Sequence, residues 1–324
     1  MPTASPELEQ ERGRDARSPS QIPLAGWKEV GWRVWDSVVE DRIMLVAGGA
    51  TFYLLLALFP ALTAFVSAYG LFANPADVMQ HVGMLGALVP SQGLDIIRGR
   101  LESLATQDSG ALGFGLVIGL LVAFWSANNG VKGLFEALNI AYRETEKRSF
   151  LRLNLVAFAF TLGAMMAAAL LITAVGIVPV ALALLRLDGL SETLVSAMRW
   201  PVLIVLIGSG IALLYRYGPS REHAKWRWIT WGSALATIVW IAASAGFSFY
   251  LQRFADYEAT YGSLGAIIGF LMWTWISVII LILGAKLNAE MEHQTAVDST
   301  TGAPKPMGER GAVMADTLGG SSDT

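Results

Sequence analysis

The stretch ATYGSLGAIIGFLMWTWISVIILILGA, residues 259–285, contains no charged side chain and carries the main structural signal of this sequence. A bilayer core is about 30 Å thick, so a helix needs roughly 20 apolar residues to cross it. This stretch is long enough and therefore predicts a membrane-spanning helix. Five further uncharged stretches predict five more. Among them 200–215 is short, but the arginines at its two ends can reach the interfaces. The six expected crossings are 43–72, 110–129, 153–185, 199–216, 229–251 and 262–285.

The connections between these crossings alternate in their content of lysine and arginine. Loops rich in these residues lie on the cytoplasmic side of a membrane, so we expect both termini in the cytoplasm. Residues 1–42 contain no apolar run of the kind that a cleavable signal needs. We therefore expect a multi-pass protein of a bacterial cytoplasmic (inner) membrane. The rich connections are 1–42 with six, 128–152 with five, 216–228 with four and the segment after 285 with three; the poor ones are 73–111 with two, 186–199 with two and 252–262 with one.

The composition fits a membrane protein and disfavours several kinds of chemistry. Of the residues, 54% are hydrophobic and 15% charged, where soluble domains average about 25% charged. The chain has no cysteine, which excludes disulfides and thiolate metal sites. Its three histidines lie in separate connections, and no carboxylate cluster or hydrolase motif is visible. We expect no enzyme activity, no cofactor, no metal and, at a net charge of −3, no nucleic-acid partner.

The chain divides into one membrane domain and two polar ends. Residues 1–23 are rich in Pro, Ser, Glu and Arg, which predicts a disordered cytoplasmic arm. Residues 292–324 likewise predict a disordered cytoplasmic tail. The domain between them, 24–291, is expected to be all-α: a polytopic membrane bundle of six transmembrane helices with additional amphipathic interfacial helices.

Three segments outside the crossings show amphipathic helical patterns. Residues 24–40 carry apolar side chains at helical spacing, typical of a helix that lies on the cytoplasmic leaflet. The segment 73–108 predicts two short helices on the outer face, and 128–152 predicts another surface helix. Pro60 lies inside the first crossing and removes one backbone hydrogen bond. A packing kink is the simpler interpretation of this proline, and a hinge is the alternative.

Polar side chains gather at the inner end of the last crossing. Lys286 and Glu290 are four residues apart, so they can pair on one helix face. A helix end that emerges among headgroups would explain them. The alternative is a polar site that faces the 128–152 connection, and its candidate members are Glu136, Asn139, Arg143, Lys286, Asn288 and Glu290.

The crossings themselves offer mostly neutral hydroxyl groups, whereas ion-coupled transporters carry ionisable residues inside the bundle. A proton or metal-ion pump is therefore not expected. A second polar concentration follows the fourth crossing, where aromatic rings alternate with arginines. This pattern suits contact with lipid headgroups. Its candidate residues are Tyr215, Arg216 and Arg221.

Short motifs follow one another in order across about residues 25–292: GATFY at 49–53 with LFP at 58–60, WSA at 125–127, ALNIAY at 137–142, YRYGP at 215–219, YGSLGA at 261–266 and GAKLNAE at 284–290. Together they resemble the YihY/BrkB integral membrane family. The family pattern has an acidic residue where this chain has Lys286. Members were once labelled ribonuclease BN, a label generally regarded as mistaken. Others are linked to serum resistance or lipopolysaccharide-lipid export, so the resemblance implies amphiphile handling and supplies no catalytic residues.

We expect a protein that binds or translocates a lipid or other amphiphile for the cell envelope. Membrane lipids are the expected partners, and a homo-oligomer is compatible with the sequence. One alternative is a non-transporting scaffold or envelope-assembly protein. A tRNA-processing ribonuclease is disfavoured because it needs a catalytic cluster. A cavity open sideways to lipid would favour the first function, and a bundle packed solid would favour the scaffold.

Overall fold

A computed structural model describes residues 11–69, 98–99, 114–172, 189–253 and 264–320 of the 324-residue chain. The described part is all-α, as predicted, with eight α-helices and one 3-10 turn. These elements are η1 (Pro19–Gln21), α2 (Leu24–Glu40), α3 (Ile43–Tyr69), α6 (Phe114–Ala141), α7 (Phe150–Ile172), α9 (Gly189–Tyr217), α10 (Trp226–Arg253), α12 (Gly265–His293) and α13 (Val313–Asp316).

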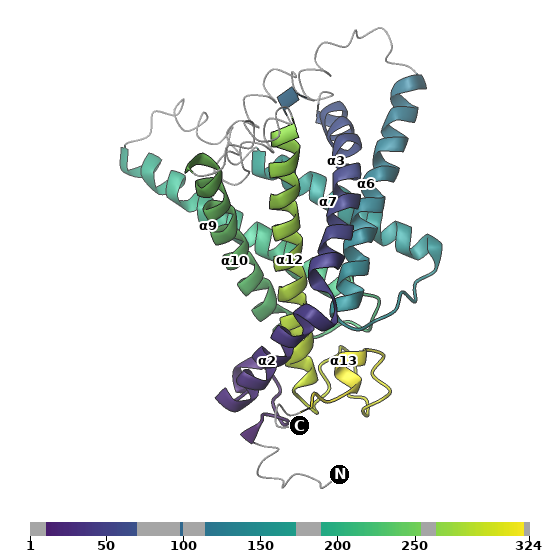
Figure 1. Cartoon of the computed structure of the whole chain (residues 1–324), viewed down its shortest axis with the longest axis vertical. Coiled ribbons are helices and arrows are strands. Elements are labelled where there is room, and N and C mark those ends of the chain that lie inside the picture. The colour runs from purple at the N-terminus through teal and green to yellow at the C-terminus, as the bar shows by residue number, and fades with distance from the viewer. Residues whose placement is uncertain (1–10, 70–97, 100–113, 173–188, 254–263, 321–324) are drawn as a thin grey trace.

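Helix α12, the stretch that opens the sequence analysis, lies at the centre of the bundle (Figure 1). It contacts α3 and α6 on one side and α10 on the other, while α9 packs against α10 and α7 against α6. Close approach of α10 and α12 depends on glycine. A Cβ added at Gly232 would collide with the Gly284 carbonyl, and one added at Gly284 would collide with the Tyr215 hydroxyl. Small residues of this kind let membrane helices pack backbone to backbone.

The helices give four candidate membrane spans among the described residues, or five if the bent pair α2 and α3 is one span. The protein is therefore multi-pass, and the prediction of six crossings is confirmed only in part. The predicted crossing 110–129 begins outside the described residues, and the last part of the predicted crossing 153–185 also lies outside them. The outer helices predicted in 73–108 also fall almost wholly outside them. The four spans are Phe150–Leu170, Trp200–Tyr217, Trp226–Leu251 and Ile267–His293.

Helix α2 has the bounds that the amphipathic pattern predicts. It meets α3 at 64° through a short turn at Asp41 and Arg42, where Arg42 has a φ of 50°. Its large side chains Trp32, Trp35 and Val39 are exposed, as a helix resting on a membrane surface requires. Contact with the cytoplasmic leaflet stays a prediction.

Two segments differ from the sequence analysis. No separate surface helix begins at residue 128, because α6 continues unbroken to Ala141 and carries the first half of 128–152 as its last turns. Helix α3 is likewise continuous through Pro60, the candidate hinge. A proline inside a helix costs one backbone hydrogen bond but leaves the helix intact where neighbouring helices support it.

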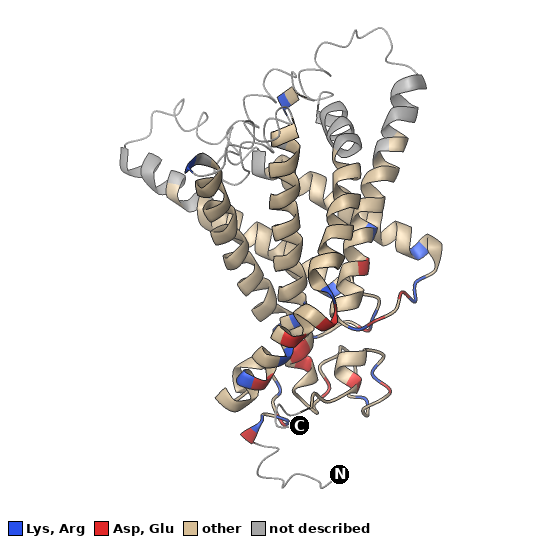
Figure 2. Ribbon diagram, viewed as in Figure 1, with Lys and Arg blue, Asp and Glu red and all other residues tan. Residues whose placement is uncertain are grey.

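Charged side chains gather at one end of the bundle, which we call the base, while the described helix lengths above it are nearly uncharged (Figure 2). Helices α2 and α13 both lie at this end (Figure 1). Residues 294–320 of the predicted disordered tail, 292–324, are instead folded against the base, and Thr295, Ser299 and Met314 are buried there. The polar composition misled the prediction because polar groups of this segment bond to protein: the Thr295 hydroxyl donates to Arg14 O at 3.0 Å and the Ser299 hydroxyl to Glu292 at 2.6 Å. Its backbone also accepts a bond, from Glu222 N–H to Gly311 O at 3.0 Å.

The predicted disordered arm differs from the structure in the same way over its described residues, 11–23. Ala16 and Ile22 are buried, and the buried Arg14 donates to the backbone oxygens of Gln294 at 3.1 Å and Gly319 at 2.6 Å. The arm and the tail therefore order each other. Neither contact is visible in local sequence, because the partners lie about 300 positions apart.

The orientation of the base can be tested with single cysteines, since the chain has none of its own. Ala303→Cys, exposed at the base, should stay unlabelled by an impermeant thiol reagent in intact cells. Ser103→Cys, in the lysine- and arginine-poor 73–111 connection, should be labelled, because the rich connections face the cytoplasm. The reverse labelling pattern would overturn the topology.

Candidate functional site

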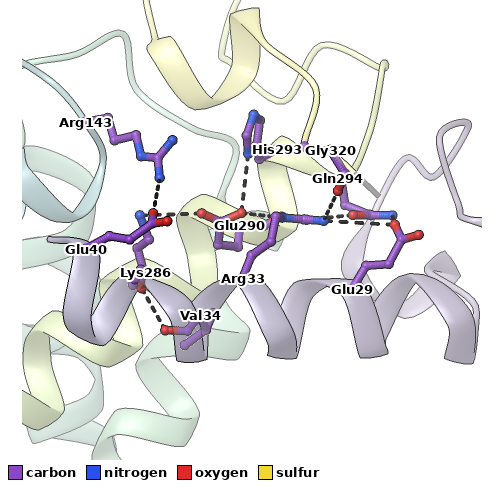
Figure 3. Close-up of polar contacts among 12 residues, drawn as sticks. Glu29, Arg33, Val34, Glu40, Arg143, Lys286, Glu290, His293, Gln294 and Gly320 are labelled. Atoms are coloured by element: carbon purple, nitrogen blue, oxygen red, sulfur yellow. Dashed lines mark hydrogen bonds and ion pairs between the residues drawn. The ribbon is translucent and has the colours of Figure 1, made fainter. Parts of the chain in front are cut away.

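Charged side chains from α2 and from Asp41, the residue after it, meet charged side chains of α12 at the base; Arg33, Lys286 and Glu290 are labelled in Figure 3. Lys286 is fully buried; its Nζ donates to Asp41 Oδ2 at 2.8 Å and lies 3.4 Å from Glu290 Oε1. Arg33 Nε donates to Glu290 Oε2 at 2.7 Å. We call Arg33, Asp41, Lys286 and Glu290 the base network. The predicted pairing of Lys286 with Glu290 is confirmed, and Glu290 faces protein rather than headgroups.

Neighbouring polar groups complete the base network. Gln294 accepts from Arg33 at 2.6 Å and donates to Glu29 at 2.9 Å, while His293 Nδ1 lies 3.3 Å from Glu290 Oε2. Two cations thus meet two carboxylates with their hydrogen bonds satisfied. Buried charges are tolerated only under this condition. The network therefore fixes the angle between α2 and α12.

A second buried ion pair lies beside the network. Arg221 donates to both Glu292 oxygens, at 3.0 and 2.7 Å, and lies 5.0 Å from the Tyr142 ring centroid. Burial alone would lower the pKa of Arg221, but the Glu292 carboxylate raises it above its ordinary value. Ser299 of the tail donates to Glu292 at 2.6 Å. The tail is thereby joined to α12 and to the connection between α9 and α10.

The candidate headgroup contacts are placed differently from the prediction. Arg221 is buried in its ion pair, and Tyr215 is buried with its hydroxyl donating to Leu281 O at 2.8 Å. Both side chains therefore hold helices together. Arg216 donates to the Ala224 carbonyl and lies 4.5 Å from the Trp226 ring centroid, with part of its surface open. Of the three, Arg216 keeps the exposure that a headgroup contact needs.

The six candidate members of the polar site do not form one site. Asn288 accepts from Gly232 N–H at 2.8 Å, and Asn139 accepts from Ser220 N–H at 2.7 Å. Glu136 is exposed, and Arg143 lies 3.6 Å from Glu40 in an exposed pair. The predicted meeting of α12 with the 128–152 connection is thus wrong for Arg143, whose partner is on α2. Sequence reasoning missed Arg33 and Asp41, which carry no local spacing signal toward Lys286.

A bidentate ion pair orders the connection between α6 and α7. Arg148 donates to Glu146 at 2.8 Å from Nε and at 2.7 Å from a terminal nitrogen. Burial raises the pKa of Glu146. Hydrogen bonds and charge from Arg148, with a hydrogen bond from Asn139, lower this pKa by more than burial raises it, to about 2. Arg148 also donates to Gly218 O at 2.7 Å. The pair therefore links this connection to the end of α9.

A cavity of 440 Å³ lies between α3 and α6, and none of its lining residues belongs to the base network. We call it the side cavity. Lys132 in its lining donates to Asn154 Oδ1 of α7 at 3.1 Å and lies 5.4 Å from the Trp125 ring centroid. The lining combines apolar surface with amide, hydroxyl and ammonium groups. It consists of Tyr53, Leu56, Ser126, Asn129, Lys132 and Gly133.

No group of three or more His, Asp or Glu side chains in the described part of the chain is arranged to hold a metal ion. The charges of the base network neutralise one another, so its geometry suits a fixed joint between helices. The side cavity, by contrast, has polar groups that can accept a ligand. An all-α bundle with several membrane spans, a charged base and a cavity in its side defines a polytopic membrane protein with one candidate ligand site.

A family model for the Virulence factor BrkB matches residues 34–308, so the chain belongs to this family. The resemblance to YihY/BrkB is thereby confirmed. The ribonuclease-like protein YfkH of Bacillus subtilis is 31% identical over 243 residues, covering 74% of this chain and 86% of that protein. No solved structure matches this chain.

More distant relatives are named as UPF0761 membrane proteins. One from Vibrio cholerae is 26% identical over 284 residues, covering 84% of this chain and 91% of that protein. One from Paraburkholderia xenovorans is 27% identical over 256 residues, covering 78% of this chain but 57% of that protein. These names place the family in the membrane and state no activity.

Glu290→Gln should destabilise the protein by about 3 kcal/mol, because it leaves Arg33 without its buried carboxylate and weakens the neutralisation of Lys286. The control is Glu40→Gln, which breaks the exposed pair with Arg143 and should cost at most about 1 kcal/mol. Thermal unfolding in detergent measures both. Equal, small losses would show that the base network does not stabilise the fold.

The contribution of Glu146 to the stability of the folded protein should depend on pH. Its pKa in the folded state is about 2, below the ordinary value of 4.5, so its stabilisation is present above pH 4.5 and is lost as pH falls through 2. Glu146→Gln should therefore lower the unfolding temperature at pH 7, and the difference from the wild type should shrink in acid. The exposed Glu309→Gln is the control. A difference that is constant with pH would contradict this assignment.

Proposed function

We propose that this protein binds a lipid or another amphiphile of the cell envelope and holds or translocates it. It would act in a bacterial cytoplasmic membrane with both termini in the cytoplasm. The side cavity is the observation that carries this proposal. Its volume of 440 Å³ falls within the range of small-molecule sites.

The chemistry of the side cavity supports an amphiphile. Leu56 and Tyr53 on α3 offer apolar surface, and both are about half exposed. Ser126 and Asn129 on α6 offer hydrogen bonds next to that surface. A molecule with a polar head and an apolar body satisfies both kinds of lining at once.

The other functions have less support. A scaffold would need no cavity, although the folded tail and the base network offer a firm surface for assembly. The name of the Bacillus relative points to ribonuclease chemistry. We place that function last because hydrolysis of RNA needs positioned acid–base groups or metal ions. We also propose that membrane lipids, and no nucleic acid, are its partners and that it has no catalytic activity. For its assembly we propose a homo-oligomer.

Lipid retention tests the proposal. The wild-type protein, purified in a mild detergent, should retain bound lipid that mass spectrometry detects. Ser126→Phe fills the side cavity from within its lining and should remove most of that lipid. Ala234→Phe adds the same ring to an exposed position of α10 and should leave retention unchanged.

Two results would contradict the proposal. One is a wild-type protein that carries no lipid and binds none when lipid is added back. The other is a Ser126→Phe variant that is folded, as judged by its unfolding temperature, and retains as much lipid as the wild type.

A further inference from the structure

Lys132 is a cation without a carboxylate partner among the described residues. Its ammonium group donates to the neutral Asn154 and faces the Trp125 ring, and neither contact neutralises its charge. Lys286 and Arg221, which are more deeply buried, are each matched to a carboxylate. The lining of the side cavity therefore presents an uncompensated positive charge.

Asn154 holds this charge in place. The side chain of Asn154 is buried, and its Oδ1 accepts from Lys132 at 3.1 Å and from Asn128 at 2.8 Å. Its own amide nitrogen donates to Phe150 O at 2.7 Å. This amide is therefore fixed within α7, and it directs the Lys132 ammonium from a second helix. A preorganised cation is a better ligand for an anion than a freely rotating one.

Exposed apolar side chains also lie on the two helices that line the side cavity. Phe52 and Leu56 of α3 are exposed, as are Leu121 and Val122 of α6. Leu121 and Val122 lie about three turns before Lys132 on the same helix, on the side away from the charged base. Acyl chains placed there would cover apolar side chains while the head of the same molecule lies beside Lys132.

We propose that Lys132 binds the anionic headgroup, a phosphate or carboxylate, of a lipid whose acyl chains lie against α3 and α6. This inference rests on the proposed function and narrows it to negatively charged amphiphiles. Lys132 attracts the negative charge, while Ser126 and Asn129 in the same lining offer further hydrogen bonds to it. A free anion would satisfy Lys132 but would leave the apolar surface uncovered.

The test compares lipids that share acyl chains and differ in charge. The full-length protein is delipidated in a nonionic detergent and titrated with phosphatidylglycerol or phosphatidylcholine, and bound lipid is counted by native mass spectrometry. The wild type should prefer phosphatidylglycerol about fivefold, the factor that one lysine contributes near anionic lipid. Inorganic phosphate, added as a competitor, should not displace the lipid.

Three variants assign the preference to Lys132. Lys132→Gln should lose the preference while still binding phosphatidylcholine, and Lys132→Arg should keep it. Lys305→Gln removes the same charge from an exposed position of the tail and should behave as the wild type. Unfolding temperatures confirm that each variant is folded.

The outcomes separate this inference from the proposed function. A protein that binds both lipids equally, or a Lys132→Gln variant that keeps the preference, overturns the inference and leaves the proposed function standing. Displacement of the lipid by inorganic phosphate also overturns it and identifies a free-anion site. A protein that binds neither lipid overturns both.

Discussion

The contact of Arg33 and Lys286 with Glu290 is the interaction on which the rest of the structure depends. It buries charges from two helices that are far apart in sequence, and each charge has a partner. An unpaired charge in that position would cost several kcal/mol. The α2–α12 angle can therefore vary little, and α12 is the helix that α3, α6 and α10 all contact.

The same network positions the walls of the side cavity. Asp41, which bonds to Lys286, comes two residues before α3 begins, so it fixes the start of the helix that carries Tyr53 and Leu56. Gly130 and Gly133 of α6 allow α3 to pack closely against α6, because a Cβ at Gly130 would lie only 2.8 Å from Ala57 Cβ. The base is thus a rigid support, and the side chains that can contact a ligand lie above it, between α3 and α6.

Local patterns in the sequence were enough to predict the all-α class, the bounds of α2 and the pairing of Lys286 with Glu290. Each of these depends on residues within one or two helical turns. The partners Arg33 and Asp41 lie about 250 positions from Lys286 and Glu290, and no spacing rule joins them. The tail was misjudged for the same reason, since its polar composition describes a solvated chain unless distant partners are known. The importance of Lys132 also depended on geometry, because Asn154 is on another helix.

A density map of the protein in lipid nanodiscs that contain phosphatidylglycerol tests the central claim most directly. The account predicts headgroup density within hydrogen-bond reach of Lys132 Nζ and acyl-chain density against Leu56 in the side cavity. A side cavity that is closed by protein side chains, or that holds only water while lipid surrounds the rest of the bundle, would contradict it.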